Sequence, residues 1–400
     1  MRIRGIEVFD GDAAIGLSEI VLTGDTVESV RATTSSASSD LSMIPGLIDT
    51  HVHLVGNAAP STADFYTWPL TTAREEQVLH GLAHAQQALR AGVTTVRDLA
   101  AGNAQVAISR SVERGIVDAA RVVSHGFVGM TAGHYDLFTP AALVDRPPTA
   151  DGPDACRHLV RVHARNGLDG IKIATGGGVL SVGDRTSWRN YTDAEISAVV
   201  DEAHALGMLV AAHCHTDDSI AIALAHGVDS LEHGTLIGAR NADEAARAGV
   251  SIAPTLLINE AIAEGTVPVS VDAREKARKL LPRRDACLAD AAQRGVRFVL
   301  GTDCNGHHVK FGDQMIELAR MANVLGLGPS DVLRAATSWA AETIGRGHDL
   351  GRLREGYAAD AVVMRGRPWE QQHVLRVENI VAVIARGRIV HGALPADMCS

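Results

Sequence analysis

Short apolar segments alternate with segments of helical periodicity between Leu41 and about residue 345. Eight of the apolar segments have the length and the residue types of β-strands, and helical segments lie between most of them. Such regular alternation is typical of an α/β protein with a parallel sheet. The expected strands are residues 41–54, 92–100, 121–126, 168–175, 207–215, 228–234, 250–255 and 296–303.

Two of the intervening segments carry clear helix signals. Residues 74–91 have apolar side chains at spacings of three and four, and Gly92 follows as a stop signal. The segment after Thr192 begins with a capping box, because Glu195 stands three residues on, and Gly207 ends it. Eight strands with such helices between them, over roughly 300 residues, predict a (β/α)8 TIM barrel. A doubly wound open sheet is the main alternative.

Both ends of the chain have the alternating pattern of short strands instead. We expect residues 1–44 and 346–400 to pair into one small β-sandwich domain, with the barrel over residues 45–345 between them. A polar, serine-rich link at residues 31–40 is expected to be a loop. The predicted fold class is therefore α/β, a TIM barrel with a small β-domain formed by the terminal segments.

The overall charge limits the kinds of partner that the protein can have. The chain has a formal net charge of −10 and a pI of about 6.0 with no basic block, so neither nucleic acid nor an anionic membrane is an expected partner. The N-terminus lacks an apolar signal core, and no apolar run approaches the ~18–20 residues of a membrane span. We therefore expect a cytoplasmic protein that acts on a small molecule.

One lysine stands in an unusual place. The chain has only four lysines, and Lys172 lies in the middle of the apolar strand segment IKIAT. A buried ammonium group is unfavourable unless it is paired or chemically changed. This placement therefore requires either a partner or a chemical role for Lys172.

Further polar side chains stand where the predicted strands end. His51 and His53 are two residues apart, so they point to the same side of their strand. Barrel enzymes place their chemistry at the carboxyl ends of the strands, and imidazole and carboxylate groups gathered there can bind a metal ion. The full set at this rim is His51, His53, Lys172, His213, His233 and Asp303.

Several motifs resemble those of the amidohydrolase superfamily. PGLIDTHVHL at residues 45–54 is similar to the opening motif of that superfamily, and AAHCH, SLEHGT and GTDC follow in the expected order. The resemblance covers nearly the whole chain, including the split β-domain. The stretch with IKI and GGG and the segment FGDQMIELARM resemble the binuclear branch of prolidase-like, Xaa-dipeptidase and ochratoxinase-like amidohydrolases.

The resemblance implies a site with two divalent metal ions, usually zinc, bridged by a carbamate. In that branch the lysine of the fourth strand, here Lys172, reacts with CO2, and the product binds both ions. A lysine beside two cations is expected to be deprotonated, which permits this reaction. The ligands carried over are His51, His53 and Asp303 for the first ion and His213 and His233 for the second.

A site of this kind implies a hydrolase. Two metal ions hold a bridging hydroxide that is nucleophilic at neutral pH, and one ion polarises the substrate carbonyl. Asp303 then acts as general base and acid, because it takes the hydroxide proton and passes it to the leaving nitrogen. The branch resemblance favours an amide (C–N) bond in N-acyl amino acids or dipeptides.

Substrate contacts are expected from histidines near the predicted ligands. His134, in GMTAGHYDLF, is similar to the substrate-side histidine of the family. His215 stands two residues after His213, so it either faces the site as a substrate contact or is a structural histidine of the rim. His307 and His308 either line the pocket or lie in a surface loop. The loop after the first strand adds aromatic side chains that either wall an apolar pocket or simply pack: Phe65, Tyr66 and Trp68.

Three alternatives to this hydrolase stay open. A mononuclear deaminase or cyclic-amide hydrolase, similar to imidazolonepropionase, would hold one ion and leave Lys172 unmodified. A carbamate or lactone hydrolase could use the same site. A scaffold built on an inactive barrel is opposed by the complete set of six ligand positions. The family often forms dimers or larger rings, so a homo-oligomer is expected.

Overall fold

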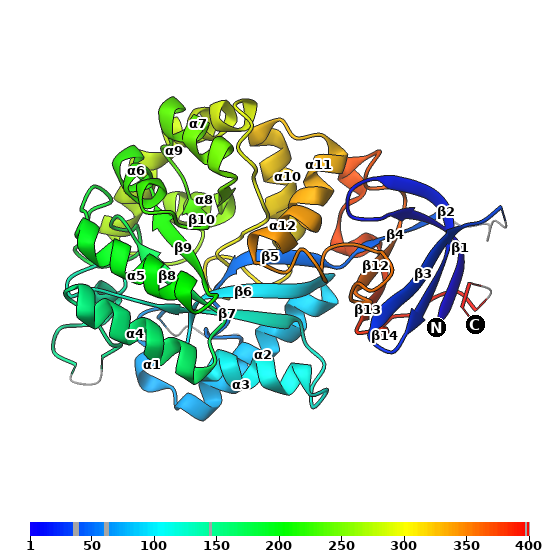
Figure 1. Ribbon diagram of the computed structural model, residues 1–400, viewed down its shortest axis with the longest axis horizontal. Helices are drawn as coiled ribbons and strands as arrows, with labels where there is room; N and C mark the ends of the chain where they lie inside the picture. Colours follow the sequence, from blue (N-terminus) through cyan, green and yellow to red (C-terminus); the bar gives the residue numbers. More distant parts are fainter. Residues whose placement is uncertain (35–39, 60–63, 144–145, 397, 400) are drawn as a thin grey trace.

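The chain forms a large body of strands and helices with a smaller, strand-rich body at one end (Figure 1). The computed structural model describes residues 1–34, 40–59, 64–143, 146–396 and 398–399. Both termini lie in the smaller body, where Ile3 and Cys399 form an antiparallel bridge. Part of the loop expected at residues 31–40, namely 35–39, lies outside the described residues.

The larger body is built around a parallel sheet of seven strands, each paired with the next along the chain. Helices cover its outer face, so the strands are buried on both sides and are rich in valine, isoleucine and alanine. The strands are β5 (Leu47–Val52), β6 (Val93–Ala101), β7 (Arg121–Phe127), β8 (Gly170–Ala174), β9 (Leu209–Cys214), β10 (Ser230–His233) and β11 (Ser251–Ala253).

The segment expected to be the eighth strand closes the ring without forming a regular strand. On one side Phe298 bridges Ile252 of β11, and on the other Cys304 bridges Val52 of β5. These bridges are isolated, and the segment includes Asp303, whose φ of +56° is incompatible with an extended ladder. The predicted TIM barrel is therefore confirmed, but its last strand is irregular.

The first predicted strand, residues 41–54, is divided between the two bodies. Its first part, β4 (Leu41–Pro45), belongs to the smaller sheet, and its second part is β5 of the barrel. Gly46 stands between them and lies against Thr94, where an added Cβ would be 2.1 Å from the Thr94 Oγ1. The prediction of one continuous strand was therefore wrong at Gly46, where the chain passes from one sheet to the other.

The smaller body is a sheet made from both ends of the chain, as expected for the terminal β-domain. Neighbouring strands run antiparallel, except that β1 and β4 are parallel, and the sheet has its own buried apolar core. The proposed domain limits at residues 45 and 346 stay a prediction. The strand order is β14 (Arg388–Gly392), β13 (Ile380–Ala385), β12 (Ala361–Arg365), β4, β1 (Arg2–Phe9), β2 (Ala14–Thr23) and β3 (Thr26–Ala32).

The two helices expected from the sequence are confirmed. They are α2 (Arg74–Arg90) and α5 (Asp193–Ala205), and the Thr192 side chain accepts a hydrogen bond from the Glu195 N–H at the start of α5. Within the described ranges, no helix has both the length and the apolar character needed to cross a membrane. The other helices are α1 (Trp68–Thr71), α3 (Asn103–Glu113), α4 (Pro153–Asn166), α6 (Asp217–Ala225), α7 (Ala239–Ala248), α8 (Leu256–Glu264), α9 (Val271–Gln293), α10 (Gln314–Leu325), α11 (Pro329–Ala335) and α12 (Ser338–Thr343), with 3-10 turns at Asp136–Phe138, Gln372–Val374 and Val377–Asn379.

Adding a methyl group at Gly46 should destabilise the protein. In Gly46→Ala the new Cβ would stand 2.1 Å from the Thr94 Oγ1 in a buried strand. Such overpacking typically lowers the free energy of unfolding by about 1–3 kcal/mol. Gly328→Ala is the control, because no atom of the residues that the structure describes lies within 4 Å of a Cβ built there. Urea unfolding followed by circular dichroism measures both variants, and equal stability would contradict the close approach.

Candidate metal centre

The side chains predicted from the sequence come together at one end of the barrel. The carboxyl ends of parallel strands share one rim, so residues far apart in the chain meet there. The residues gathered at this rim are His51 in β5, His53 just after it, Lys172 in β8, His213 in β9, His233 at the end of β10 and Asp303 in the closing segment.

One group of candidate ligands contains His51, His233 and Asp303. One ligand atom of each lies within 4.8 Å of the others, which is close enough for a single metal ion. His51 Nε2 lies 3.7 Å from Asp303 Oδ1, and His53 Nε2 lies 3.1 Å from the same oxygen. His53 therefore joins this group through Asp303.

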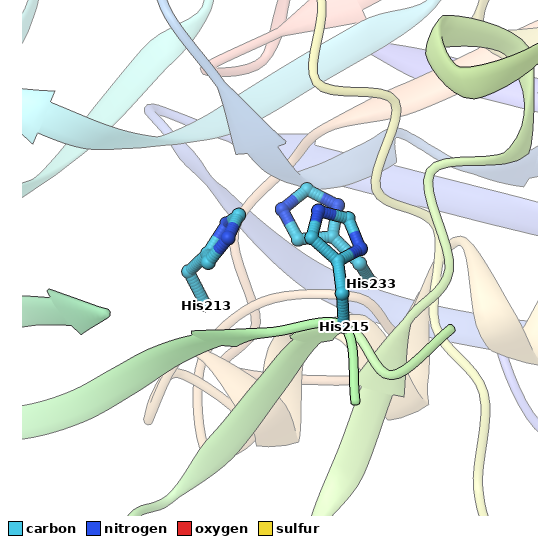
Figure 2. Close-up of side chains that lie close together, drawn as sticks. All are labelled: His213, His215 and His233. Atoms are coloured by element: carbon cyan, nitrogen blue, oxygen red, sulfur yellow. The ribbon is translucent and has the colours of Figure 1, made fainter. Parts of the chain in front are cut away.

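A second group contains His213, His215 and His233, again with ligand atoms within 4.8 Å of one another. Figure 2 shows these three rings lying close together near the ends of β9 and β10. The ring centroid of His233 lies 4.6 Å from those of both other rings. Because His233 is common to both groups, two ions bound there would be neighbours. His215, expected from the sequence to contact the substrate, lies among the candidate ligands as well.

Hydrogen-bond partners determine which ring nitrogen faces the centre. His233 Nδ1 lies 2.6 Å from the Thr255 hydroxyl, which leaves Nε2 as the nitrogen available to a metal ion. His215 has the same arrangement with another threonine hydroxyl at 2.7 Å. In His213 the engaged nitrogen is Nε2, which lies 3.4 Å from the Gly177 carbonyl oxygen, so Nδ1 is the nitrogen available to a metal ion.

Lys172 is the most unusual member of the set. Its side chain is 2% exposed, and its Nζ has no hydrogen-bond partner among the described residues. Burial lowers the pKa of Lys172 to about 8, although the nearby carboxylate of Glu232 opposes the shift. Ile171 and Ile173 on either side are fully buried in the apolar core. Burial therefore favours the neutral form of this amine more than water would.

Asp303 and His233 have an unusual backbone conformation. Their φ angles of +56° and +69° lie in the left-handed region, which residues other than glycine rarely adopt. Such conformations typically destabilise a protein by about 1–3 kcal/mol each and cluster at functional sites. Burial would raise the pKa of Asp303, but the nearby His51 and the hydrogen bond with His53 lower it to about 2. Asp303 is therefore a carboxylate that faces histidine rings.

His134, expected to contact the substrate, lies beside these two groups. Its ring stacks on that of His213 with the centroids 4.2 Å apart. Its Nδ1 lies 2.8 Å from the Ser181 Oγ and 3.5 Å from the Asp184 Oδ2. A Cβ at Gly178 would stand 2.0 Å from the His134 ring. Glycine at this position therefore lets the loop after β8 lie directly against His134.

Aromatic rings extend away from His134. The Phe138 centroid lies 5.2 Å from that of His134, and the Phe65 and Tyr66 centroids lie 6.5 and 6.4 Å from that of Phe138. Phe65 also contacts two histidines of the loop after Asp303. Trp68 does not join them, because it is buried against a histidine of α2. We call this set the aromatic wall: Phe65, Tyr66, Phe138, His307 and His308.

Comparison with known proteins identifies the family. The family model described as "Amidohydrolase family" matches residues 42–391, which is most of the chain. The chain belongs to the amidohydrolase family. As an amidohydrolase, the protein is a hydrolase that acts on amide bonds.

Three similar proteins place this amidohydrolase more closely. An ochratoxinase of Aspergillus niger is 29% identical over 371 residues, which cover 86% of this chain and 74% of that protein. A solved structure of a Xaa-Pro dipeptidase with bound methionine is 28% identical with a TM-score of 0.87, and 98% of this chain and 99% of that chain are covered. An imidazolonepropionase of Halobacterium salinarum is 30% identical over 182 residues, which cover 42% of this chain and 37% of that protein. The predicted prolidase-like and ochratoxinase-like branch is confirmed.

Amidohydrolases generally bind metal ions, and the residues of this amidohydrolase fit such ions. Imidazole nitrogen and carboxylate oxygen are the donors that zinc and related metals prefer. Two groups of these donors have the required proximity. The buried Nζ of Lys172 also lacks a partner within the described part of the chain, which an additional group at this centre would explain.

A buried ion pair next to these histidines was not expected from the sequence. Arg97 of β6 and Glu232 of β10 are 1% and 0% exposed, and Arg97 Nη2 lies 2.8 Å from Glu232 Oε1. Burial would raise the pKa of Glu232, but Arg97 and Lys172 hold it well below its usual range. The other carboxylate oxygen lies 2.8 Å from His51 Nδ1. Arg97, like Lys172, is a charged residue inside an apolar strand. This feature of the sequence could have indicated that Arg97 needs a buried partner.

Removing Arg97 should strongly destabilise the barrel. Arg97→Met leaves the Glu232 carboxylate buried without its cation, which typically lowers the free energy of unfolding by about 3–5 kcal/mol. Arg31→Met, at an exposed arginine, should change it by less than about 0.5 kcal/mol. Adding Glu232→Gln to Arg97→Met removes the unpaired charge and should recover part of the loss. Urea unfolding without added metal measures all three, and an Arg97→Met variant as stable as the control would refute the role of the pair.

Proposed function

We propose that this amidohydrolase is a binuclear metal-dependent enzyme that hydrolyses the amide bond of N-acyl amino acids or dipeptides. The observation that carries the proposal is Lys172, a buried amine without a hydrogen-bond partner among the described residues. Its charge acts on His51, His53 and His213. The similar proteins described as an ochratoxinase and a Xaa-Pro dipeptidase support an amide or peptide substrate.

Lys172 would carry a carbamate in this proposal. Its lowered pKa increases the fraction of neutral amine, whose lone pair can form an N–C bond with CO2. One proton leaves the nitrogen, so the product is an anion whose oxygen atoms can bind two cations. The reaction would thus replace a buried amine that lacks a partner with a metal ligand.

The two groups of donors would hold the ions. When bound, divalent ions, with zinc as the expected metal, polarise a substrate carbonyl and lower the pKa of water. His215 belongs to the second group and would contribute a further ligand there. The proposed ligands are His51, His53 and Asp303 for one ion and His213 and His233 for the other, with Lys172 between them.

The side chains of the protein would move the proton and orient the substrate. Asp303, a carboxylate beside His53, would accept the proton of the attacking water and deliver it to the leaving nitrogen. His134 has its Nδ1 engaged by Ser181, so its Nε2 is available to the substrate. The aromatic wall offers ring faces to an apolar side chain.

A mononuclear cyclic-amide hydrolase or deaminase is a second candidate. It is favoured by the similarity to an imidazolonepropionase and by the group of His213, His215 and His233, which by itself fits one ion. A carbamate or lactone hydrolase on the same site is a third candidate. A small-molecule substrate, association into a homo-oligomer and a cytoplasmic location stay predictions.

Replacing Lys172 should remove metal and activity together. Protein purified with zinc and bicarbonate should bind two ions per chain and show a carbamate carbon in 13C NMR. Lys172→Ala should lose this signal and lose at least about 100-fold in activity, since removal of an outer partner of a metal ligand already lowers activity about 10–100-fold. Lys279→Ala, at an exposed lysine, is the control.

Two outcomes of this experiment would count against the binuclear site. A fully metallated and active Lys172→Ala variant would exclude the carbamate. A single ion on each wild-type chain, without a carbamate signal, would favour the mononuclear candidate.

The released product distinguishes the substrate classes. The metal-loaded protein is offered N-acyl amino acids, dipeptides, carbamates, lactones and cyclic amides, and new primary amine, ammonia and acid are measured. Primary amine from the first two classes is the expected result. Ammonia or ring opening alone would move the protein to the second candidate.

The aromatic wall should favour aromatic side chains among these substrates. Phe138→Ala should lower kcat/KM for N-acyl phenylalanine by up to about tenfold, since an aromatic pair contributes about 0.5–1.5 kcal/mol, and should affect N-acyl alanine less. Ile116→Ala, at a side chain that is 68% exposed, is the control. Equal losses for the two substrates would show that the wall does not recognise the side chain.

A further inference from the structure

His51 and His233 differ in the partner of their Nδ1. His51 Nδ1 lies 2.8 Å from Glu232 Oε2, and this ion-pair contact joins two buried atoms that have no hydrogen bond of regular geometry among the described residues. His233 Nδ1 instead faces the hydroxyl of Thr255. A carboxylate is a stronger hydrogen-bond acceptor than a hydroxyl. The partner of His51 therefore fixes the orientation of its ring and the position of its ring proton more strongly than the partner of His233 does.

Glu232 cannot turn away from His51 without losing other contacts. Its Oε1 accepts hydrogen bonds from Arg97 Nη2 and from the Ser230 hydroxyl, each at 2.8 Å. Arg97 is itself held in place, because its Nε donates to the Thr50 carbonyl at 2.7 Å. Oε1 therefore accepts the hydrogen bonds of Arg97 and Ser230, and Oε2 faces His51.

The backbone of β10 brings Glu232 and His233 to the same ring. Consecutive residues of a strand normally face opposite sides, but the φ of +69° at His233 ends this alternation. The His233 ring lies 5.1 Å from the His51 ring, and Glu232 meets that ring at Nδ1. One short strand thus supplies both a candidate ligand and a carboxylate that can orient a second one.

We propose that Glu232, held by Arg97, is a positioning residue for the metal centre. With a carboxylate at Nδ1, the ring proton of His51 stays on Nδ1, and the lone pair of Nε2 faces Asp303, 3.7 Å away. Carboxylates in this position orient metal-binding histidines and strengthen their interaction with the ion. The effect on metal affinity rests on the proposed function, whereas the position of the ring proton does not.

Glu232→Gln tests the inference because it changes one oxygen to an amide nitrogen and keeps the shape. Arg97 has only donors, so it should select the amide oxygen and leave the NH2 group facing His51 Nδ1. The ring proton should then move to Nε2, where it blocks a metal ion. 15N NMR of the metal-free protein should show Nδ1–H in the wild type and Nε2–H in the variant, with the His51 signal identified by its loss in His51→Asn. The Zn²⁺ affinity, measured by competition with a chelator, should fall about 10–100-fold.

Glu317→Gln is the matched control. Glu317 is also fully buried, but it accepts the Leu256 N–H at the start of α8, so the substitution should change neither the His51 tautomer nor the Zn²⁺ affinity. Circular dichroism and thermal unfolding verify that each variant is folded.

Two results would overturn the inference. The first is Nε2–H in the wild-type protein, which decides the matter even when Glu232→Gln does not fold. The second is an unchanged tautomer and Zn²⁺ affinity in a folded Glu232→Gln variant. If the wild-type protein shows Nδ1–H on His51 but hydrolyses none of the amide substrates, the result would count against the proposed function and not against this inference.

Discussion

The arrangement of buried charges inside the barrel is the constraint on which the rest of the site depends. Arg97 and Glu232 are withdrawn from water and remain stable there because each supplies the partner that the other needs. One oxygen of Glu232 is used by Arg97 and the other lies against His51. This distribution leaves Lys172 in the same interior without a hydrogen-bond partner among the described residues. The buried group without a hydrogen-bond partner is the one with a chemical role in the proposed function.

The rim of the barrel adds a second level of organisation. The strands of the barrel are regular and buried. His233, at the end of β10, and Asp303, at the end of the closing segment, instead have left-handed backbone conformations. These conformations let the two side chains face the candidate metal centre, which the alternation of a regular strand would not allow. The tightly packed barrel stabilises the two strained residues. The loop after β8 contributes in the same way, because Gly178 lets it lie against His134. A rigid scaffold thus carries a strained set of polar groups.

Much of this arrangement follows from local patterns in the chain. Periodicity predicted the strands and the two best helices, because the side chains of a buried strand and of an amphipathic helix follow simple periods. The histidines at the strand ends could be predicted for the same reason. The predictions were wrong where the backbone leaves its regular path. Gly46 stands between two strands of different sheets, and Thr94 occupies the space that a side chain would need at this position. The closing segment, which contains Asp303, makes only isolated bridges among the described residues.

The sequence by itself determined the barrel, the order of the polar residues along it and the burial of Lys172, because these depend on neighbours in the chain. The tertiary structure alone decided which of these residues meet. It placed His215 with His213 and His233, and it paired Arg97 with Glu232 across strands that are separated by more than a hundred residues. Such contacts depend on how the strands are ordered around the ring and on how each strand bends at its end. Both result from packing between residues that are far apart in the chain. The alternation of side chains along a single strand carries no information about such packing.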